Sequence, residues 1–126
     1  MKVLIVDDER DVETLFRQKF RKEIRSNDVE LVFAFSGEEA MEILQQTDPP
    51  NVVYVFSDIN MPGMTGLELL EKIKSRFPQI YVSMISAYSD NENYSKAKKS
   101  GAKEFFTKPI DFNSLKKEIK EMDNQI

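Results

Sequence analysis

Five side chains with the chemistry of a phosphoryl-transfer site stand at or near the ends of apolar segments in this chain of 126 residues. They are Asp7, Asp8, Asp58, Ser86 and Lys108. Carboxylates bind hard metal ions or attack phosphorus, whereas hydroxyl and ammonium groups bind phosphoryl oxygens. This chemistry requires a fold that brings the five side chains to one point.

The segments that precede these residues are typical of buried parallel strands. Residues 2–6, 52–57 and 80–86 are runs rich in Val, Ile, Tyr, Phe and Met that are too short for an ordinary helix. Two further strands are predicted over residues 29–35 and 102–107. Open α/β sheets bind ligands outside the carboxyl ends of their strands, so Asp58 stands where a site residue is expected.

Segments of helical periodicity alternate with these strands. Helices are predicted over residues 11–24, from Ser36 to a stop at 48–51, from Thr65 to Pro78, over 91–100, and from Asp111 through Met122. Five strands and five helices predict a doubly wound α/β fold in one domain, residues 1–126. The first and third strands are the most apolar and belong at the centre, which favours the flavodoxin-like order 2-1-3-4-5.

Composition excludes several kinds of site. The chain has no His and no Cys, so Ser-His-Asp catalysis and zinc sites built from His or thiolates are excluded. The net charge of -4 gives no general reason to expect direct nucleic-acid or anionic-membrane binding. No apolar segment is long enough to span a bilayer, and the start resembles no signal peptide, so we expect a cytoplasmic protein.

With the expected strand order, the three acids emerge from adjacent strand ends. Asp7, Asp8 and Asp58 in one crevice would repel one another unless they share a cation. Mg²⁺ suits them best, because it prefers oxygen ligands and keeps waters that phosphate oxygens can replace. A carboxylate nucleophile that forms an aspartyl phosphate needs no general base.

These motifs, taken together, resemble the receiver domains of two-component response regulators. The resemblance covers essentially the whole chain. Its matching parts are Asp7-Asp8, the run DINMPGMTG that begins at Asp58, Ser86-Ala87 and Lys108-Pro109.

The resemblance implies a role for each of these residues. Asp58 would be the phosphoacceptor, and Asp7, Asp8, Asp58 and the backbone carbonyl of Asn60 would hold Mg²⁺. Ser86 and Lys108 would bind the phosphoryl oxygens, with the Lys108-Pro109 peptide bond in the cis form. Ser86 and Phe105 would move together as a switch.

Two positions are expected to set the lifetime of the phosphorylated state. They are Asn60, two residues after the acceptor, and Tyr88, two residues after Ser86. Our hypothesis is that the bulky Tyr88 overhangs the phosphoryl group and slows attack by water.

The resemblance also implies partners. A sensor histidine kinase or a phosphotransfer protein would donate the phosphoryl group, because this chain has no His to carry one. The output face would comprise the fourth helix, fifth strand and fifth helix, which would contact an effector or a second copy of the chain. The polar end at 123–125 is compatible with a linker to an effector domain.

Three alternatives remain at this stage. A degenerate receiver would keep the fold and serve as an interaction or dimerisation module. A phosphatase of the haloacid dehalogenase type also uses an Asp at a strand end, but it generally has a second Asp where this chain has Asn60. A flavodoxin-like electron carrier would need a phosphate loop after the first strand, and none is present.

Overall fold

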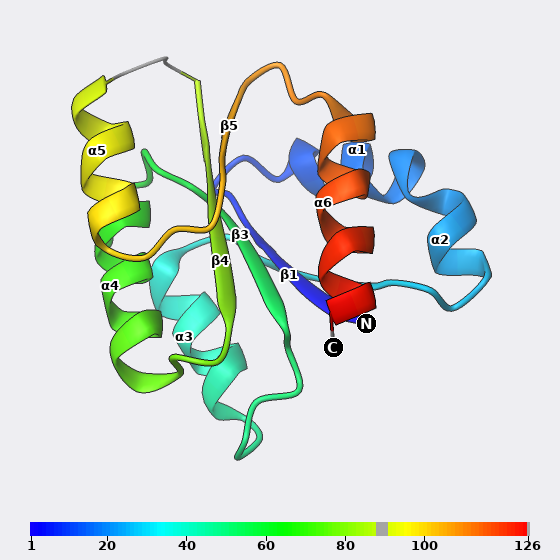
Figure 1. The fold of residues 1–126 in the computed structure, drawn as a ribbon, viewed down its shortest axis with the longest axis horizontal. Helices are drawn as coiled ribbons and strands as arrows, with labels where there is room; N and C mark the ends of the chain where they lie inside the picture. Colours follow the sequence, from blue (N-terminus) through cyan, green and yellow to red (C-terminus); the bar gives the residue numbers. More distant parts are fainter. Residues whose placement is uncertain (88–90, 126) are drawn as a thin grey trace.

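Five strands form a single parallel sheet in the order β2-β1-β3-β4-β5 (Figure 1). The structure, a computed structural model, describes residues 1–87 and 91–125. The strands are β1 (Lys2–Val6), β2 (Glu30–Ala34), β3 (Tyr54–Asp58), β4 (Tyr81–Ser86) and β5 (Phe105–Thr107). The predicted fold class and strand order are confirmed, and β5 is shorter than the segment predicted for it.

Helices cover both faces of this sheet (Figure 1). They are α1 (Asp11–Lys19), α2 (Arg21–Arg25), α3 (Gly37–Gln45), α4 (Gly66–Arg76), α5 (Asn91–Lys99) and α6 (Phe112–Gln125). One face carries α1, α2 and α6, and the other carries α3, α4 and α5. Among the helices of the described residues, none has the length and apolar character needed to cross a membrane.

The sheet separates two apolar cores. Successive strand residues point to opposite faces, so Leu4 and Val6 pack with α3, α4 and α5, whereas Val3 and Ile5 pack with α1 and α6. Because helices cover both faces of the sheet, the side chains that point to either face of β1 are apolar. This explains why β1 is a continuous hydrophobic run in the sequence.

The first predicted helix is in fact two helices, so the part of the chain that the structure describes contains six helices where five were predicted. The backbone leaves helical geometry at Phe20, with φ -101° and ψ 17°. Hydrogen bonds still continue across the break, from Phe20 N–H to Phe16 O and from Ile24 N–H to Phe20 O, both at 2.9 Å. The Phe20 ring is buried and stacked on Phe16, and Ile24 packs against the same core, so both sides of the break stay in contact with the core.

Strand β2 forms one edge of the sheet, and two arginines cover the aromatic side chains there. The Arg17 guanidinium lies 4.9 Å from the centroid of the Phe33 ring. The Arg10 guanidinium lies 4.3 Å from the centroid of Phe35, which directly follows the strand. Both contacts are cation–π interactions.

Candidate functional site

Three carboxylates meet at the carboxyl ends of β1 and β3. Asp7 and Asp8 follow β1 directly, and Asp58 is the last residue of β3. One oxygen from each carboxylate lies within 4.8 Å of the others. Asp7 and Asp58 are only 5% and 6% exposed, whereas Asp8 is open to solvent. The acids predicted from the sequence therefore form a crevice with one accessible side.

The position of Asp58 depends on close contact with the start of α4. A Cβ atom on Gly66 would lie 2.0 Å from the Asp58 carbonyl oxygen, so only a glycine fits there. The Gly66 N–H donates to the Ile59 carbonyl at 2.8 Å. A reciprocal capping box between Thr65 and Glu68 fixes where this helix begins.

Asp7 is held by backbone groups as well as by its charge. Its side-chain Oδ1 accepts the Glu9 N–H at 2.9 Å, and its own N–H donates to the Ala34 carbonyl at 3.1 Å. The contact from Glu9 was not predicted. A backbone donor is present in every residue except proline, so it leaves no signal in the sequence.

Lys108 brings a positive charge to the crevice from the β5 side. Its Nζ donates to Asp7 Oδ2 at 3.0 Å and lies 3.8 Å from Asp58 Oδ1. Its backbone N–H donates to the Ser86 carbonyl at 2.8 Å, which joins the ends of β4 and β5. The Lys108-Pro109 peptide bond is cis.

The charges of the crevice perturb one another. Burial, the neighbouring Asp7 and, to a smaller extent, Asp8 raise the pKa of Asp58 from 3.8 to about 6, although Lys108 opposes this shift. Burial alone would lower the pKa of Lys108, but the hydrogen bond to Asp7 and the charge of Asp58 raise it above its usual value. One ammonium group thus only partly balances three carboxylates.

The donor set fits a hard divalent cation. All three side chains offer carboxylate oxygens, which Mg²⁺ prefers, and the exposed Asp8 leaves a side open for water ligands. Burial raises the pKa of Asp58 most, the charges of Asp7 and Asp8 add to this shift, and a bound cation would favour the ionised carboxylate against both effects. Nitrogen and sulfur ligands are absent from this group, which disfavours softer metals.

Of the other predicted site residues, Ser86, Asn60 and Phe105 lie within the described part of the chain. Ser86 is fully buried at the end of β4, and Asn60 is exposed two residues after Asp58. Phe105 is half-buried in β5, where its ring contacts Tyr94 edge-on at 5.5 Å between centroids. Tyr88 falls within residues 88–90, outside the described part of the chain.

Known proteins share both the sequence pattern and the fold. The sequence profile of the response regulator receiver domain family matches residues 3–120. Sporulation initiation phosphotransferase F of Bacillus subtilis is 30% identical over 119 residues, which cover 94% of this chain and 90% of that protein. A cyclic di-GMP phosphodiesterase of Thermotoga maritima is 31% identical over 119 residues, but these cover only 30% of that larger protein.

A solved structure adds a ligand to this comparison. It is the response regulator protein TrrA of Thermotoga maritima, crystallised in complex with Mg²⁺-BeF. It shares 28% identity with this chain and superposes with a TM-score of 0.78, covering 95% of this chain and 96% of that one.

Proposed function

This chain belongs to the response regulator receiver domain family, and from that membership we propose that Asp58 accepts a phosphoryl group in a Mg²⁺-dependent reaction. The observation that carries the proposal is the arrangement of charges in the crevice. Three carboxylates lie within 4.8 Å of one another, and Lys108 Nζ lies 3.0 Å from Asp7 and 3.8 Å from Asp58.

The reaction is a transfer between two nucleophiles. An Asp58 carboxylate oxygen attacks phosphorus, and the bond between phosphorus and the donor breaks. The electron pair of that bond leaves with the donor, as acetate from acetyl phosphate or, from a phosphohistidine whose other ring nitrogen carries a proton, as neutral imidazole. Water later attacks the aspartyl phosphate, which restores the carboxylate and releases inorganic phosphate.

Each neighbouring group has a separate role in this transfer. Asp7, Asp8, Asp58 and the Asn60 carbonyl hold Mg²⁺, which neutralises negative charge when bound. Lys108 and Ser86 bind the phosphoryl oxygens from the β4 and β5 side. Support for this division comes from the sheet order, which places the acids on β1 and β3 and the other two groups on β4 and β5.

The partners follow from the same role. A sensor histidine kinase or a phosphotransfer protein donates the phosphoryl group, because this chain has no His. Phosphorylation shifts Ser86 and Phe105 and changes the face formed by α5, β5 and α6, which contacts an effector or a second copy. Helix α5 has Ala97 as its one buried residue, so few contacts oppose its movement. Asn60 and Tyr88 set how long the phosphorylated state lasts.

Intact-mass measurement tests the phosphoacceptor role. The protein is incubated with Mg²⁺ and acetyl phosphate, alongside Asp58→Asn and a sample containing EDTA. Asp123→Asn is the matched control, since it makes the same chemical change at an exposed position of α6. We expect one phosphoryl adduct in wild type and Asp123→Asn, and none in Asp58→Asn or with EDTA. An adduct that survives in Asp58→Asn would refute the assignment.

If wild type gains no adduct, even from a histidine kinase, the chain is a degenerate receiver that keeps the fold but is not phosphorylated. Turnover of external phosphoesters would instead indicate a phosphatase.

A further inference from the structure

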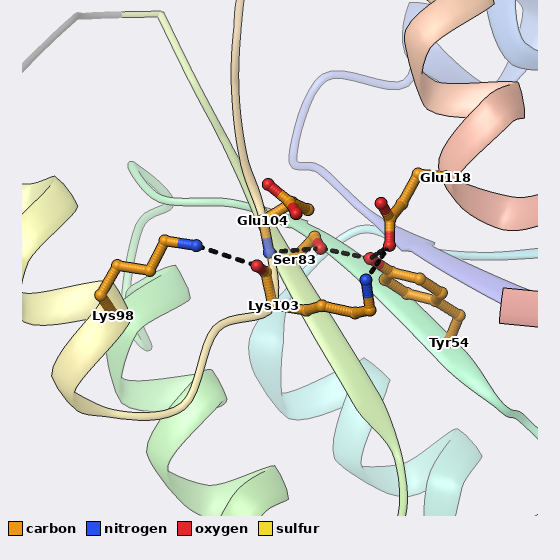
Figure 2. Close-up of polar contacts among 6 residues, drawn as sticks. All are labelled: Tyr54, Ser83, Lys98, Lys103, Glu104 and Glu118. Carbon is orange, nitrogen blue, oxygen red and sulfur yellow. Dashed lines mark hydrogen bonds and ion pairs between the residues drawn. The ribbon is translucent and has the colours of Figure 1, made fainter. Parts of the chain in front are cut away.

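Four polar side chains from separate parts of the fold meet on the α6 side of the sheet (Figure 2). We call this group the polar latch, and it consists of Tyr54 in β3, Ser83 in β4, Lys103 before β5 and Glu118 in α6. The Tyr54 hydroxyl lies 2.5 Å from Ser83 Oγ and donates to Glu118 Oε1 at 3.3 Å. Lys103 Nζ forms an ion pair with the same Glu118 oxygen.

The hydrogen bonds of the polar latch run in one direction. The Glu104 N–H donates to Ser83 Oγ at 3.1 Å. Because the Tyr54 proton is directed to Glu118, Ser83 must donate its own proton to the Tyr54 oxygen. The hydrogen bonds thus run from Glu104 N–H through Ser83 and Tyr54 to the Glu118 carboxylate. Hydrogen bonds aligned in such a chain polarise and strengthen one another.

Because the polar latch is buried, breaking its hydrogen bonds costs free energy. Tyr54 and Ser83 are fully buried, and Glu118 is 8% exposed. Burial raises the pKa of Tyr54 well above its usual value, so the hydroxyl stays protonated and remains a donor. The hydrogen bond to Glu118 likewise raises the pKa of Lys103. Removing one member leaves buried polar atoms without a partner.

The polar latch holds the beginning of β5. Ser83 accepts the N–H of Glu104, the residue before Phe105, and the Lys98 ammonium donates to the Lys103 carbonyl at 2.9 Å (Figure 2). The other end of this short strand leads to Lys108, which bonds to the Ser86 carbonyl. Ser83 and Ser86 lie on one strand, about 10 Å apart at the usual rise per residue.

The two sides of the crevice depend on the polar latch unequally. Strand β3 pairs with β1 through four residues and with β4 through five, so it is held from both sides. Strand β5 pairs with β4 alone, through three residues. Backbone hydrogen bonds from Lys103 N–H to the Val82 carbonyl and from Met84 N–H to the Glu104 carbonyl also hold the start of β5. Loss of the polar latch therefore leaves β5 attached to β4 but loosens it and Lys108 more than the strand end that carries Asp58.

We propose that Tyr54, Ser83, Lys103 and Glu118 are positioning residues that hold β5 against β4, so that Lys108 and Ser86 can bind a phosphoryl group. This rests on the proposed function of the crevice. The positioning role separates two parts of that function. Binding of Mg²⁺ by the acids at the ends of β1 and β3 does not need the polar latch, whereas binding of the phosphoryl group by Lys108 and Ser86 does. Loss of the polar latch lowers affinity for the phosphoryl group and does not weaken the binding of Mg²⁺.

Tyr54→Phe is the sharpest test. It removes the bridging hydroxyl and keeps the ring, which stacks on Phe56 at 4.3 Å between centroids. Ser83→Ala removes the acceptor for the Glu104 N–H as well. Lys116→Met is the matched control, because it removes an ion pair at 3.2 Å that ties α6 to Glu23 of α2 and leaves the polar latch intact.

Two affinities are measured for each protein by calorimetric titration. The first is for Mg²⁺ alone, and the second is for beryllofluoride, an analogue of the phosphoryl group, at saturating Mg²⁺. We expect Tyr54→Phe to weaken beryllofluoride binding about three- to tenfold, as loss of one buried hydrogen bond suggests, with Mg²⁺ binding within about twofold of wild type. We expect Ser83→Ala to bind beryllofluoride more weakly than Tyr54→Phe does, and Lys116→Met to bind both ligands as tightly as wild type.

The outcomes separate the two proposals. If wild type binds beryllofluoride and Tyr54→Phe binds it equally well, the positioning role is wrong and the phosphoacceptor role stands. If both affinities fall together in Tyr54→Phe, the effect is general destabilisation and the positioning role is again refuted. If wild type binds neither Mg²⁺ nor beryllofluoride, the function of the crevice fails, and the role of the polar latch fails with it. Should Ser83→Ala not fold, Tyr54→Phe alone decides.

Discussion

Replacing Gly66 by Ala would test the contact that sets Asp58 against α4. The new Cβ would lie 2.0 Å from the Asp58 carbonyl oxygen and 2.7 Å from Ile59 Cα. Both are backbone atoms at a buried strand end, so neither can rotate away as a side chain would. Either the helix or the strand end must therefore move.

The size of the effect follows from two opposing terms. Alanine favours a helix over glycine by up to about 1 kcal/mol. Overpacking costs about 1–3 kcal/mol, and a contact this short against backbone belongs at the upper end, about 3 kcal/mol. We therefore expect Gly66→Ala to lower the free energy of unfolding by about 2 kcal/mol and to slow phosphorylation, because Asp58 is displaced.

Gly37→Ala provides a matched control, because Gly37 is also the first residue of a helix, α3. The three atoms nearest to a Cβ there all belong to the Met64 side chain, with Sδ at 2.7 Å, Cβ at 2.9 Å and Cγ at 3.0 Å. A rotamer change moves Sδ away and leaves only a slightly short contact with Cβ, so we expect a smaller loss of stability than in Gly66→Ala, about 1 kcal/mol. Urea unfolding followed by circular dichroism measures both variants. Equal stability of the two variants would show that the contact with Asp58 is not the constraint we describe.

Three further changes test the charges and the cap. In EDTA, Asp58→Asn is expected to be more stable than wild type, because the fold raises the pKa of Asp58 from 3.8 to about 6 and so disfavours its ionised form. A shift of about two units corresponds to about 3 kcal/mol, which solvent at the crevice mouth reduces to about 1–2 kcal/mol. The penalty on wild type grows as the pH rises from about 4 through 6 and is complete above about 7, so urea midpoints across this range should diverge; parallel midpoints would contradict the shift. Lys108→Met removes the contacts to Asp7 and Asp58, and we expect phosphorylation by acetyl phosphate to slow at least about tenfold; an unchanged rate would exclude Lys108 from the transfer. Thr65→Ala removes the hydroxyl that accepts the Glu68 N–H, and thermal unfolding should report a loss of about 1 kcal/mol; no loss would mean that the cap is not needed to start α4.

The sequence predicted the sheet and the acidic crevice because both depend on local patterns. Continuous apolar runs mark the buried strands, and Asp7, Asp8 and Asp58 stand at the ends of two of them. The break at Phe20 was missed because residues 11–25 contain neither Pro nor Gly. At this break Phe20 is buried and stacks on Phe16, a contact that periodicity cannot distinguish from ordinary core packing.

The polar latch could not be predicted, since its members are distant in the chain. Tyr54 and Glu118 are 64 residues apart, and Tyr54 and Ser83 are 29 apart. In the sequence, Tyr54 was interpreted as one more large residue of an apolar strand. The one local signal was Ser83, a polar residue inside the run 80–86, because a buried hydroxyl needs a partner.

The two edges of the sheet bear on whether a strand of a second molecule could extend it. The unpaired backbone groups of the edge strand β2 could pair with another chain, but the guanidinium groups of Arg17 and Arg10 lie over the rings of Phe33 in this strand and Phe35 just after it. A strand from a second molecule would have to displace or bury these charges. At the opposite edge, β5 offers only three residues for pairing. Amyloid-like extension of the sheet is thus disfavoured at both edges.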